Sequence, residues 1–263
     1  MQNKPVNPLL ERARMPGETF TLPSGGLFYV NGELAETVEN GEVYINPMVT
    51  LDEIILKSPD KLYTGEGIVE VFGRCVPQVL KPNELLSNDV DFILTALRKI
   101  SFGNTTEITY THNCEKAKEH KYKLDMSKFI KNTKNIDPTS IKREYTKTLM
   151  NGQVIMLAPP KFLPSLKMYQ ASLGTENVSE KELEDSVLTN VAAMMQKVDD
   201  ISDQTMIHEW VSVLTPEQLL EIKDFVTETS EWGTNFETKV KCEDCGKEID
   251  ITSEMNPVSF FFL

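Results

Sequence analysis

The most constraining feature of this sequence is a pair of cysteines in the stretch KVKCEDCGKEIDI, residues 239–251. Cys242 and Cys245 are separated by two residues and followed by a glycine, and strand-like segments flank them. The glycine lets the backbone swing around a bound ion. Turns of this kind each supply two ligands of a zinc ribbon, in which four sulfur or nitrogen atoms meet tetrahedrally. A metal site here therefore needs a second turn elsewhere in the chain.

A candidate for that second turn is THNCEKAKEH, residues 111–120, which also lies between two alternating, strand-like segments. It is imperfect, because Ala117 stands where a second cysteine would follow Cys114. His120, six residues after Cys114, can reach the same point, and His112 is the other candidate. The long separation from the second turn is no obstacle, since the entropy cost of loop closure grows only logarithmically with length.

The two turns together predict one structural zinc site. Its expected ligands are Cys114, His120, Cys242 and Cys245, with His112 as the alternative histidine. Four protein ligands leave no open coordination position, so such a site would be structural and not catalytic. Two alternatives stay open: a ribbon that has lost its metal but keeps buried thiols, and a redox dithiol. The acidic residues Glu243 and Asp244 disfavour the redox dithiol, because redox cysteines usually lie in electropositive surroundings.

Hydrophobic periodicity predicts an α+β fold with a small-sheet N-terminal portion, zinc-ribbon-like paired hairpins and a mainly helical insertion. We expect an α+β portion with the first hairpin at residues 1–125, the mainly helical insertion at 126–235, and the second hairpin with an apolar tail at 236–263. The expected strands are two within 19–30 around a Pro-Ser-Gly-Gly turn, then 41–48, 105–111, 120–125, 144–149, 153–157 and a pair flanking the last two cysteines. The expected helices are 50–58, opened by a capping box at Thr50–Glu53, then 64–76, 82–100, 179–198, 205–213 and 215–232.

Charge is unevenly distributed along the chain, whose formal net charge is −13. Residues 176–231 carry 14 acidic residues and 3 lysines, while residues 116–147 carry 10 basic and 4 acidic residues. The simplest interpretation is two solvated faces, and the functional one is electrostatic guidance of a partner. A nucleic-acid-binding zinc-ribbon protein that uses the basic segment is the alternative function. We expect no nucleic acid partner, because an acidic chain lacks the dominant basic footprint that phosphate binding requires.

Several classes of protein are disfavoured by what the sequence lacks. It contains no nucleotide-binding glycine loop, no nucleophile elbow and no His-Glu-x-x-His motif, so we expect a protein that is not an enzyme. No apolar run approaches the roughly 18 residues of a membrane span. The N-terminal stretch has no continuous apolar segment of the kind that a secretory signal contains. We therefore expect a cytoplasmic protein without disulfides.

Both ends of the chain carry candidate partner-binding residues. The last four residues are large and apolar, which would be a liability if they were exposed to solvent. They either dock on the protein's own core or anchor it to another subunit. The N-terminal arm, with its apolar pair and arginines, has the same two interpretations. The candidate contact residues are Leu9, Leu10, Arg12, Phe260, Phe261, Phe262 and Leu263.

The stretches NPLLERARMPGETFTLPSGGLFYVNGEL, NGEVYINPMVTLDEIILKSPDKLYTGEG and CVPQVLKPNELLSNDVDFILTALRKISFG, followed by HNCEKAKEH and CEDCG, are together distinctive. In these the chain resembles the baseplate hub assembly proteins of T-even-type contractile-tail bacteriophages. The resemblance covers most of the first 125 residues and the last 25, and it is weak in the middle. It implies a hub subunit or an assembly chaperone that works through contacts with other hub or tail proteins, including the tape-measure protein as a candidate. It further implies assembly in the host cytoplasm, with retention in the baseplate of the virion as an open alternative.

Overall fold

The computed structural model describes residues 15–112, 119–139, 145–166, 188–189, 191–229, 231–251 and 261. Over these residues the fold is a mixture of helices and four small antiparallel sheets, as expected for the α+β class. Three clusters of buried apolar side chains hold the elements together. Among the described residues, no helix combines the length and the apolarity needed to cross a membrane.

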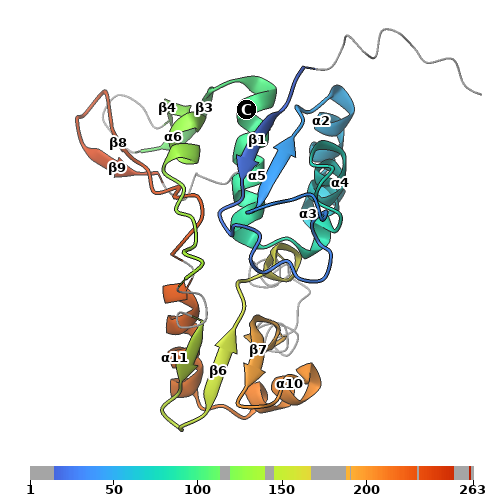
Figure 1. Cartoon of the computed structure of the whole chain (residues 1–263). Coiled ribbons are helices and arrows are strands. Elements are labelled where there is room, and N and C mark those ends of the chain that lie inside the picture. Colours follow the sequence, from blue (N-terminus) through green and yellow to red (C-terminus); the bar gives the residue numbers. More distant parts are fainter. Residues whose placement is uncertain are drawn as a thin grey trace, which may run out of the picture.

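The first cluster is built by the N-terminal sheet and the helices beside it (Figure 1). Its elements are β1 (Glu18–Thr21), β2 (Glu42–Ile45), α2 (Thr50–Leu56), α3 (Pro59–Thr64), α4 (Glu66–Cys75), the 3₁₀ turn η1 (Pro82–Glu84) and α5 (Ser87–Phe102). Helix α4 shows why the periodicity was informative. Ile68, Val71, Phe72 and Cys75 recur at three- and four-residue spacing, and all four are buried in this cluster.

The prediction of a strand immediately after the Pro-Ser-Gly-Gly turn is wrong. Strand β1 pairs instead with β2, with Glu18 opposite Ile45, and residues 22–29 form successive turns. The backbone at Gly25 lies against Gly41, where an added Cβ would be 2.6 Å from the Gly25 carbonyl carbon. The side chain of Tyr29 is committed elsewhere, because its hydroxyl donates a hydrogen bond to Asp89 on α5. Contacts with α5 therefore replace the local hairpin.

Two helix starts differ from the sequence expectation by a few residues. The capping residue of α2 is Val49, one position earlier than expected, and the Asp52 carboxylate accepts its backbone N–H at 2.9 Å. The expected helix from residue 82 is divided, with η1 separated from α5 by the extended residues Leu85 and Leu86. Helix α3 was not expected from the pattern. The apolar positions of α5 are nevertheless buried as predicted.

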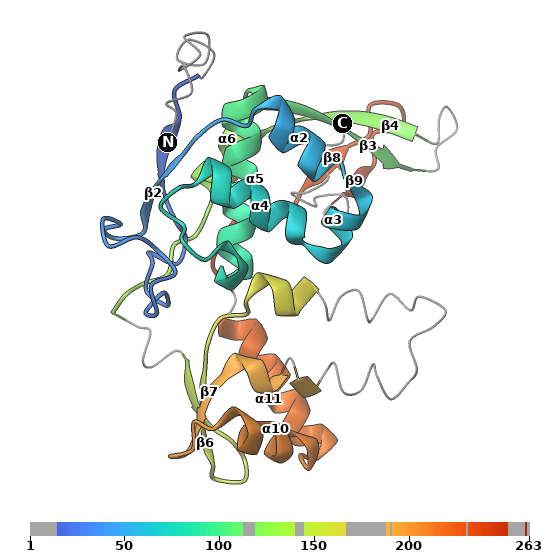
Figure 2. The ribbon, with the colours of Figure 1, turned by 90° about the vertical axis from the view of Figure 1, so that its right-hand side faces the viewer.

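Two hairpins distant in sequence share the third cluster. They are β3 (Thr105–Thr111) with β4 (Glu119–Asp125), followed by α6 (Met126–Lys131), and β8 (Lys239–Lys241) with β9 (Glu248–Asp250). Figures 1 and 2 both show β8 and β9 beside β3 and β4. The buried members of this cluster are Ile108, Tyr110, Leu124, Met126, Phe129, Val240 and Ile251. The pairing of the two hairpins that the sequence suggested is therefore present in the structure.

The middle of the chain contains a sheet as well as helices. Its elements are β5 (Thr146–Thr148), β6 (Val154–Leu157), β7 (Met195–Val198), α10 (Gln204–Ser212) and α11 (Pro216–Thr229). The expectation that residues 195–198 end a long helix is wrong, because Met195 and Val198 are buried and pair with β6. The description of this part as mainly helical is accordingly incomplete. The rest of that predicted helix lies largely outside the described residues.

The three clusters are joined by a few specific contacts. Asn88 on α5 donates a hydrogen bond to the Trp232 carbonyl at 2.6 Å, and Lys134 forms a bridge with Gly233. Figure 2 shows the sheet of β6 and β7 with α10 and α11 on one side of these junctions and the other two clusters on the opposite side. The division at residues 125 and 235 remains a prediction.

Candidate metal centre

The second hairpin turn has a conformation that brings its two cysteines together. Cys242 donates its backbone N–H to the Lys247 carbonyl at 2.9 Å, and Gly246 donates to the Cys242 carbonyl at 2.9 Å. Gly246 has a φ of 72°, a left-handed conformation that favours glycine. The two thiols point to the same region, with Cys242 buried and Cys245 exposed. The local sequence Cys-x-x-Cys-Gly therefore forms the tight turn expected of it.

The first hairpin contributes two histidines. Strand register places Tyr110 opposite His120, and the two rings stack with centroids 5.3 Å apart. His112 follows the end of β3 and is half-buried. Cys114, the expected partner of His120 in the predicted ligand set, lies outside the described residues, as does Ala117.

The hairpins bring together two overlapping groups of metal-ligating atoms. In the first, one ring nitrogen of His112 and the sulfurs of Cys242 and Cys245 all lie within 4.8 Å of one another. The His112 Nε2 atom is 3.2 Å from the Cys245 sulfur. In the second, His120 Nδ1 is 4.0 Å from the Cys242 sulfur and 3.7 Å from a carboxylate oxygen of Asp244. Cys242 belongs to both groups.

The predicted ligands fall into two different groups in this arrangement. Cys242 is grouped with Cys245 in one set and with His120 in the other, so His120 and Cys245 share no group. His112, the alternative histidine, is the one grouped with both cysteines. The complete ligand set stays a prediction, because Cys114 is outside the described residues.

The donor set fits a zinc ion. Thiolate and imidazole are the ligands that structural zinc sites use, and they also select against hard cations such as magnesium and calcium. The surroundings are rich in potential negative charge. Burial raises the pKa of Tyr110, and the nearby Cys242, Glu243, Cys245 and Asp244 raise it further. The cluster can therefore hold a metal cation, and a dication would offset this negative potential.

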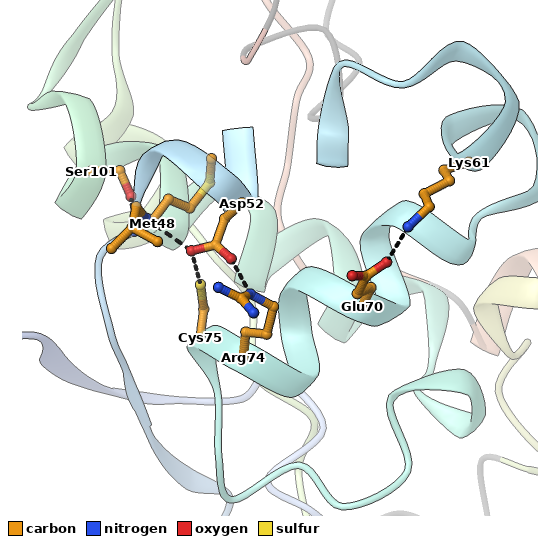
Figure 3. A network of polar contacts seen from close by, with 8 residues as sticks. Met48, Asp52, Lys61, Glu70, Arg74, Cys75 and Ser101 are labelled. Atoms are coloured by element: carbon orange, nitrogen blue, oxygen red, sulfur yellow. Dashed lines mark hydrogen bonds and ion pairs between the residues drawn. The ribbon is translucent and has the colours of Figure 1, made fainter. Parts of the chain in front are cut away.

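A second polar cluster, between α2 and α4, is structural. Figure 3 shows the buried Asp52 carboxylate between Arg74 and Cys75. Asp52 accepts hydrogen bonds from the Arg74 guanidinium, from the Val49 backbone N–H at 2.9 Å, and from the Cys75 thiol at 3.7 Å. The hydrogen bond with Asp52 raises the pKa of Arg74. These contacts cap α2 and join it to the end of α4, where Cys75 is buried in the first cluster.

The comparisons with known proteins give one match. A model of the T4 bacteriophage base plate protein family matches residues 20–262. The chain belongs to this family. Searches of curated proteins and of solved structures found no match. The resemblance read from the sequence is thereby confirmed at the level of the base plate protein family, and the match includes the middle of the chain, where the resemblance was weak.

In this base plate protein, one of the predicted contact residues at the chain ends, Phe261, is described. Phe261 is only 4% exposed and belongs to the first hydrophobic cluster, where its ring meets Phe102 edge to face at 6.3 Å. This residue packs on the protein's own core, the intramolecular one of the two alternatives. The remaining predicted contact residues lie outside the described residues: Leu9, Leu10, Arg12, Phe260, Phe262 and Leu263. Their role in partner binding stays a prediction.

A surface that the sequence analysis did not identify lies near the N-terminal arm. Met15, the first described residue, lines the same surface hollow as Val49 at the start of α2. Leu51 and Ile54, one helical turn apart on α2, are 50% and 61% exposed. The available signal was their spacing, because Leu51 and Ile54 lie three positions apart and therefore share one side of α2.

Proposed function

We propose that this base plate protein is a subunit of the baseplate hub or a factor that assembles the hub, and that it acts through protein–protein contacts without catalysing a reaction. The observation that carries the proposal is the family match over residues 20–262. Its partners would be other hub or tail proteins, with the tape-measure protein as a candidate. The site of action would be the cytoplasm of the infected host during assembly.

The exposed apolar side chains of Met15, Val49, Leu51 and Ile54 support a contact surface at this end of the molecule. Contiguous apolar surface on a protein usually marks an interaction site. We propose that this surface, which we call the α2 face, receives apolar side chains of another base plate protein. The arm that precedes Met15, with Leu9 and Leu10, would extend the same contact.

We further propose that the cysteine and histidine cluster holds one structural zinc ion. The reason is the small size of the third cluster, which joins two hairpins far apart in sequence and has, among the described residues, seven buried side chains, two of them on α6. Cores of this size commonly need a metal or a disulfide for stability. Zinc binding would supply folding free energy directly and would fix the last strands against the middle of the chain.

Co-purification from infected cells tests the proposed role. An affinity-tagged full-length chain is expressed during infection, and the proteins recovered with it are identified by mass spectrometry. We expect hub or tail proteins among them. Recovery of no hub, tail or tape-measure protein would overturn the proposal.

A pair of matched variants tests the α2 face. Leu51→Asp with Ile54→Asp places two charges on this face, and Val213→Asp with Leu220→Asp places two on remote side chains that are 77% and 56% exposed. We expect the first variant alone to lose partner recovery, with circular dichroism unchanged in both. Equal recovery with the two variants would remove the α2 face from the contact.

A further inference from the structure

We propose that the metal centre is a Cys₂His₂ site formed by His112, His120, Cys242 and Cys245, so that both histidines are ligands and Cys114 is not. This inference rests on the structural zinc ion proposed above and specifies its ligands. All four residues are described in the structure, and together they supply two sulfur and two nitrogen atoms from two hairpins. Cys₂His₂ is one of the established compositions of closed zinc sites.

His112 lies at nearly the spacing that a zinc ligand requires. In a tetrahedral site, with zinc–sulfur bonds of about 2.3 Å and zinc–nitrogen bonds of about 2.0–2.1 Å, neighbouring nitrogen and sulfur ligands are roughly 3.6 Å apart. The His112 Nε2 atom is 3.2 Å from the Cys245 sulfur, which is close to this spacing. The Cys242 sulfur lies within 4.8 Å of both atoms. Three ligand atoms therefore already surround one point.

A hydrogen bond from His120 indicates which of its ring nitrogens would bind the metal. Its Nε2 atom is 3.3 Å from the backbone carbonyl oxygen of His112. A carbonyl only accepts hydrogen bonds, so this nitrogen carries a proton, and in a zinc-bound ring Nδ1 would be the nitrogen that presents the lone pair. That lone pair lies on the side of Cys242, 4.0 Å from its sulfur. Histidine ligands of metals usually donate their other N–H to a carbonyl or carboxylate in this way.

The surroundings of His120 hold its ring in this orientation. The Tyr110 ring stacks on it with an interplanar angle of 24°, and the His120 side chain is only 9% exposed. The ring centroids of His112 and His120 are 5.8 Å apart, so both imidazoles face the same turn. The His120 nitrogen is near ligand spacing from Cys242 alone, at 4.0 Å, and it shares no group with His112 and Cys245, so the proposed site closes around the ion as zinc binds.

Asp244 is the competitor for the position of His120. One of its carboxylate oxygens is 3.7 Å from His120 Nδ1, and its side chain is 32% exposed. A carboxylate is a harder ligand than a thiolate or an imidazole and suits magnesium or calcium better than zinc. In the proposed site Asp244 does not coordinate the metal, and its partly exposed carboxylate lies beside the ligands.

X-ray absorption at the zinc edge tests the ligand set. The full-length protein is stripped with a chelator, reloaded with Zn²⁺ alone, and its metal content measured by elemental analysis. We expect one zinc per chain, with two sulfur neighbours at about 2.3 Å and two nitrogen neighbours at about 2.0–2.1 Å. The control variant Cys114→Ser should keep both the stoichiometry and this ratio. His112→Ala, His120→Ala and Cys242→Ser should each weaken zinc binding by at least about tenfold.

Other outcomes distinguish a failure of the Cys₂His₂ ligand set from a failure of the structural zinc proposal. Three sulfurs and one nitrogen in the wild type, with zinc lost in Cys114→Ser, would overturn the Cys₂His₂ set and leave the structural zinc in place. Zinc loss in Asp244→Asn but not in His120→Ala would overturn it as well, in favour of a carboxylate ligand. No zinc in the reloaded wild type would overturn both. Because the wild-type spectrum alone decides the sulfur count, a histidine variant that fails to fold does not obstruct the test.

Discussion

The substitution Tyr29→Phe tests the contact that replaces the expected N-terminal hairpin. The Tyr29 hydroxyl donates a hydrogen bond to Asp89 at 2.6 Å and accepts one from the Leu86 backbone N–H at 3.0 Å. The other oxygen of Asp89, which is fully buried, accepts the Ser24 backbone N–H at 3.0 Å. Phenylalanine removes one oxygen atom and leaves the ring in place. The substitution therefore isolates these two hydrogen bonds from hydrophobic packing.

The expected loss of stability follows from the two groups that lose their hydrogen-bond partner, the Asp89 carboxylate and the Leu86 N–H. A hydrogen bond to a charged group contributes about 1.5–3 kcal/mol, and leaving the Leu86 N–H without its acceptor costs about 1–3 kcal/mol. The two are not fully additive, because both depend on the same hydroxyl. We expect the free energy of unfolding to fall by about 2–4 kcal/mol, a large part of the stability of a typical domain.

The loss should also depend on pH. Burial raises the pKa of Asp89 above its ordinary value of 3.8, and the hydrogen bonds from Ser24 and Tyr29 act in the opposite direction. Because the folded-state pKa is raised, the unfolded chain releases this proton first, and stability falls as pH rises from 3.8 through the folded pKa. Removing the hydroxyl raises that pKa further. The difference between variant and wild type should therefore be larger near neutral pH than near pH 4.

Urea unfolding at about pH 4.5 and about pH 7.5 measures both effects, with the slope of the free energy against urea as a check on unchanged compactness. The matched control is Tyr44→Phe, whose exposed hydroxyl accepts the Gly17 N–H at 2.8 Å. The control should lose no more than about 1 kcal/mol. A Tyr29→Phe loss equal to that of the control at both pH values would refute the reasoning.

Two further predictions concern α5 and the end of the chain. Burial of its carboxyl group raises the pKa of Asp91 from 3.8 to about 7, so wild-type stability should fall as pH rises across this interval. Asp91→Asn should remove this fall, which totals at most about 4 kcal/mol at about 1.4 kcal/mol per pKa unit, in free energies of unfolding recorded against pH. An unchanged fall would contradict the prediction. Phe261→Ala should lower the free energy of unfolding by about 3 kcal/mol, since it removes a buried ring from the contact with Phe102. Unchanged stability with lost partner recovery would instead assign Phe261 to a partner contact.

Local patterns predicted the elements whose residues interact within the same segment. The apolar spacing in α4 and α5 was sufficient because each helix buries one continuous face. Alternation was sufficient for β3, whose inward residues Thr106, Ile108 and Tyr110 are all buried. Strand β7 was assigned to a helix because its buried residues Met195 and Val198 lie three positions apart, a helical spacing, and only the irregular pairing with β6 makes this segment a strand.

The candidate metal centre shows the same division. The Cys-x-x-Cys-Gly turn could be recognised because its backbone bonds join residues at most five positions apart. The choice between His112 and His120 could not be made from spacing, since both histidines lie within a few residues of the first turn. The structure brings both of them toward Cys242, 130 and 122 positions away in sequence respectively.

The sequence by itself determined the family, the mixed fold class, most of the helices and strands, and the two hairpins that meet at the cysteines. These depend on local periodicity and turn chemistry, which act over a few residues. Tertiary structure alone decided that β1 pairs with β2, that Tyr29 and Asp89 meet inside the protein, that both histidines face the cysteine turn, and that Phe261 is buried. In each case several contacts have comparable local energy. The contact that forms is the one that lets the whole chain bury its apolar surfaces together.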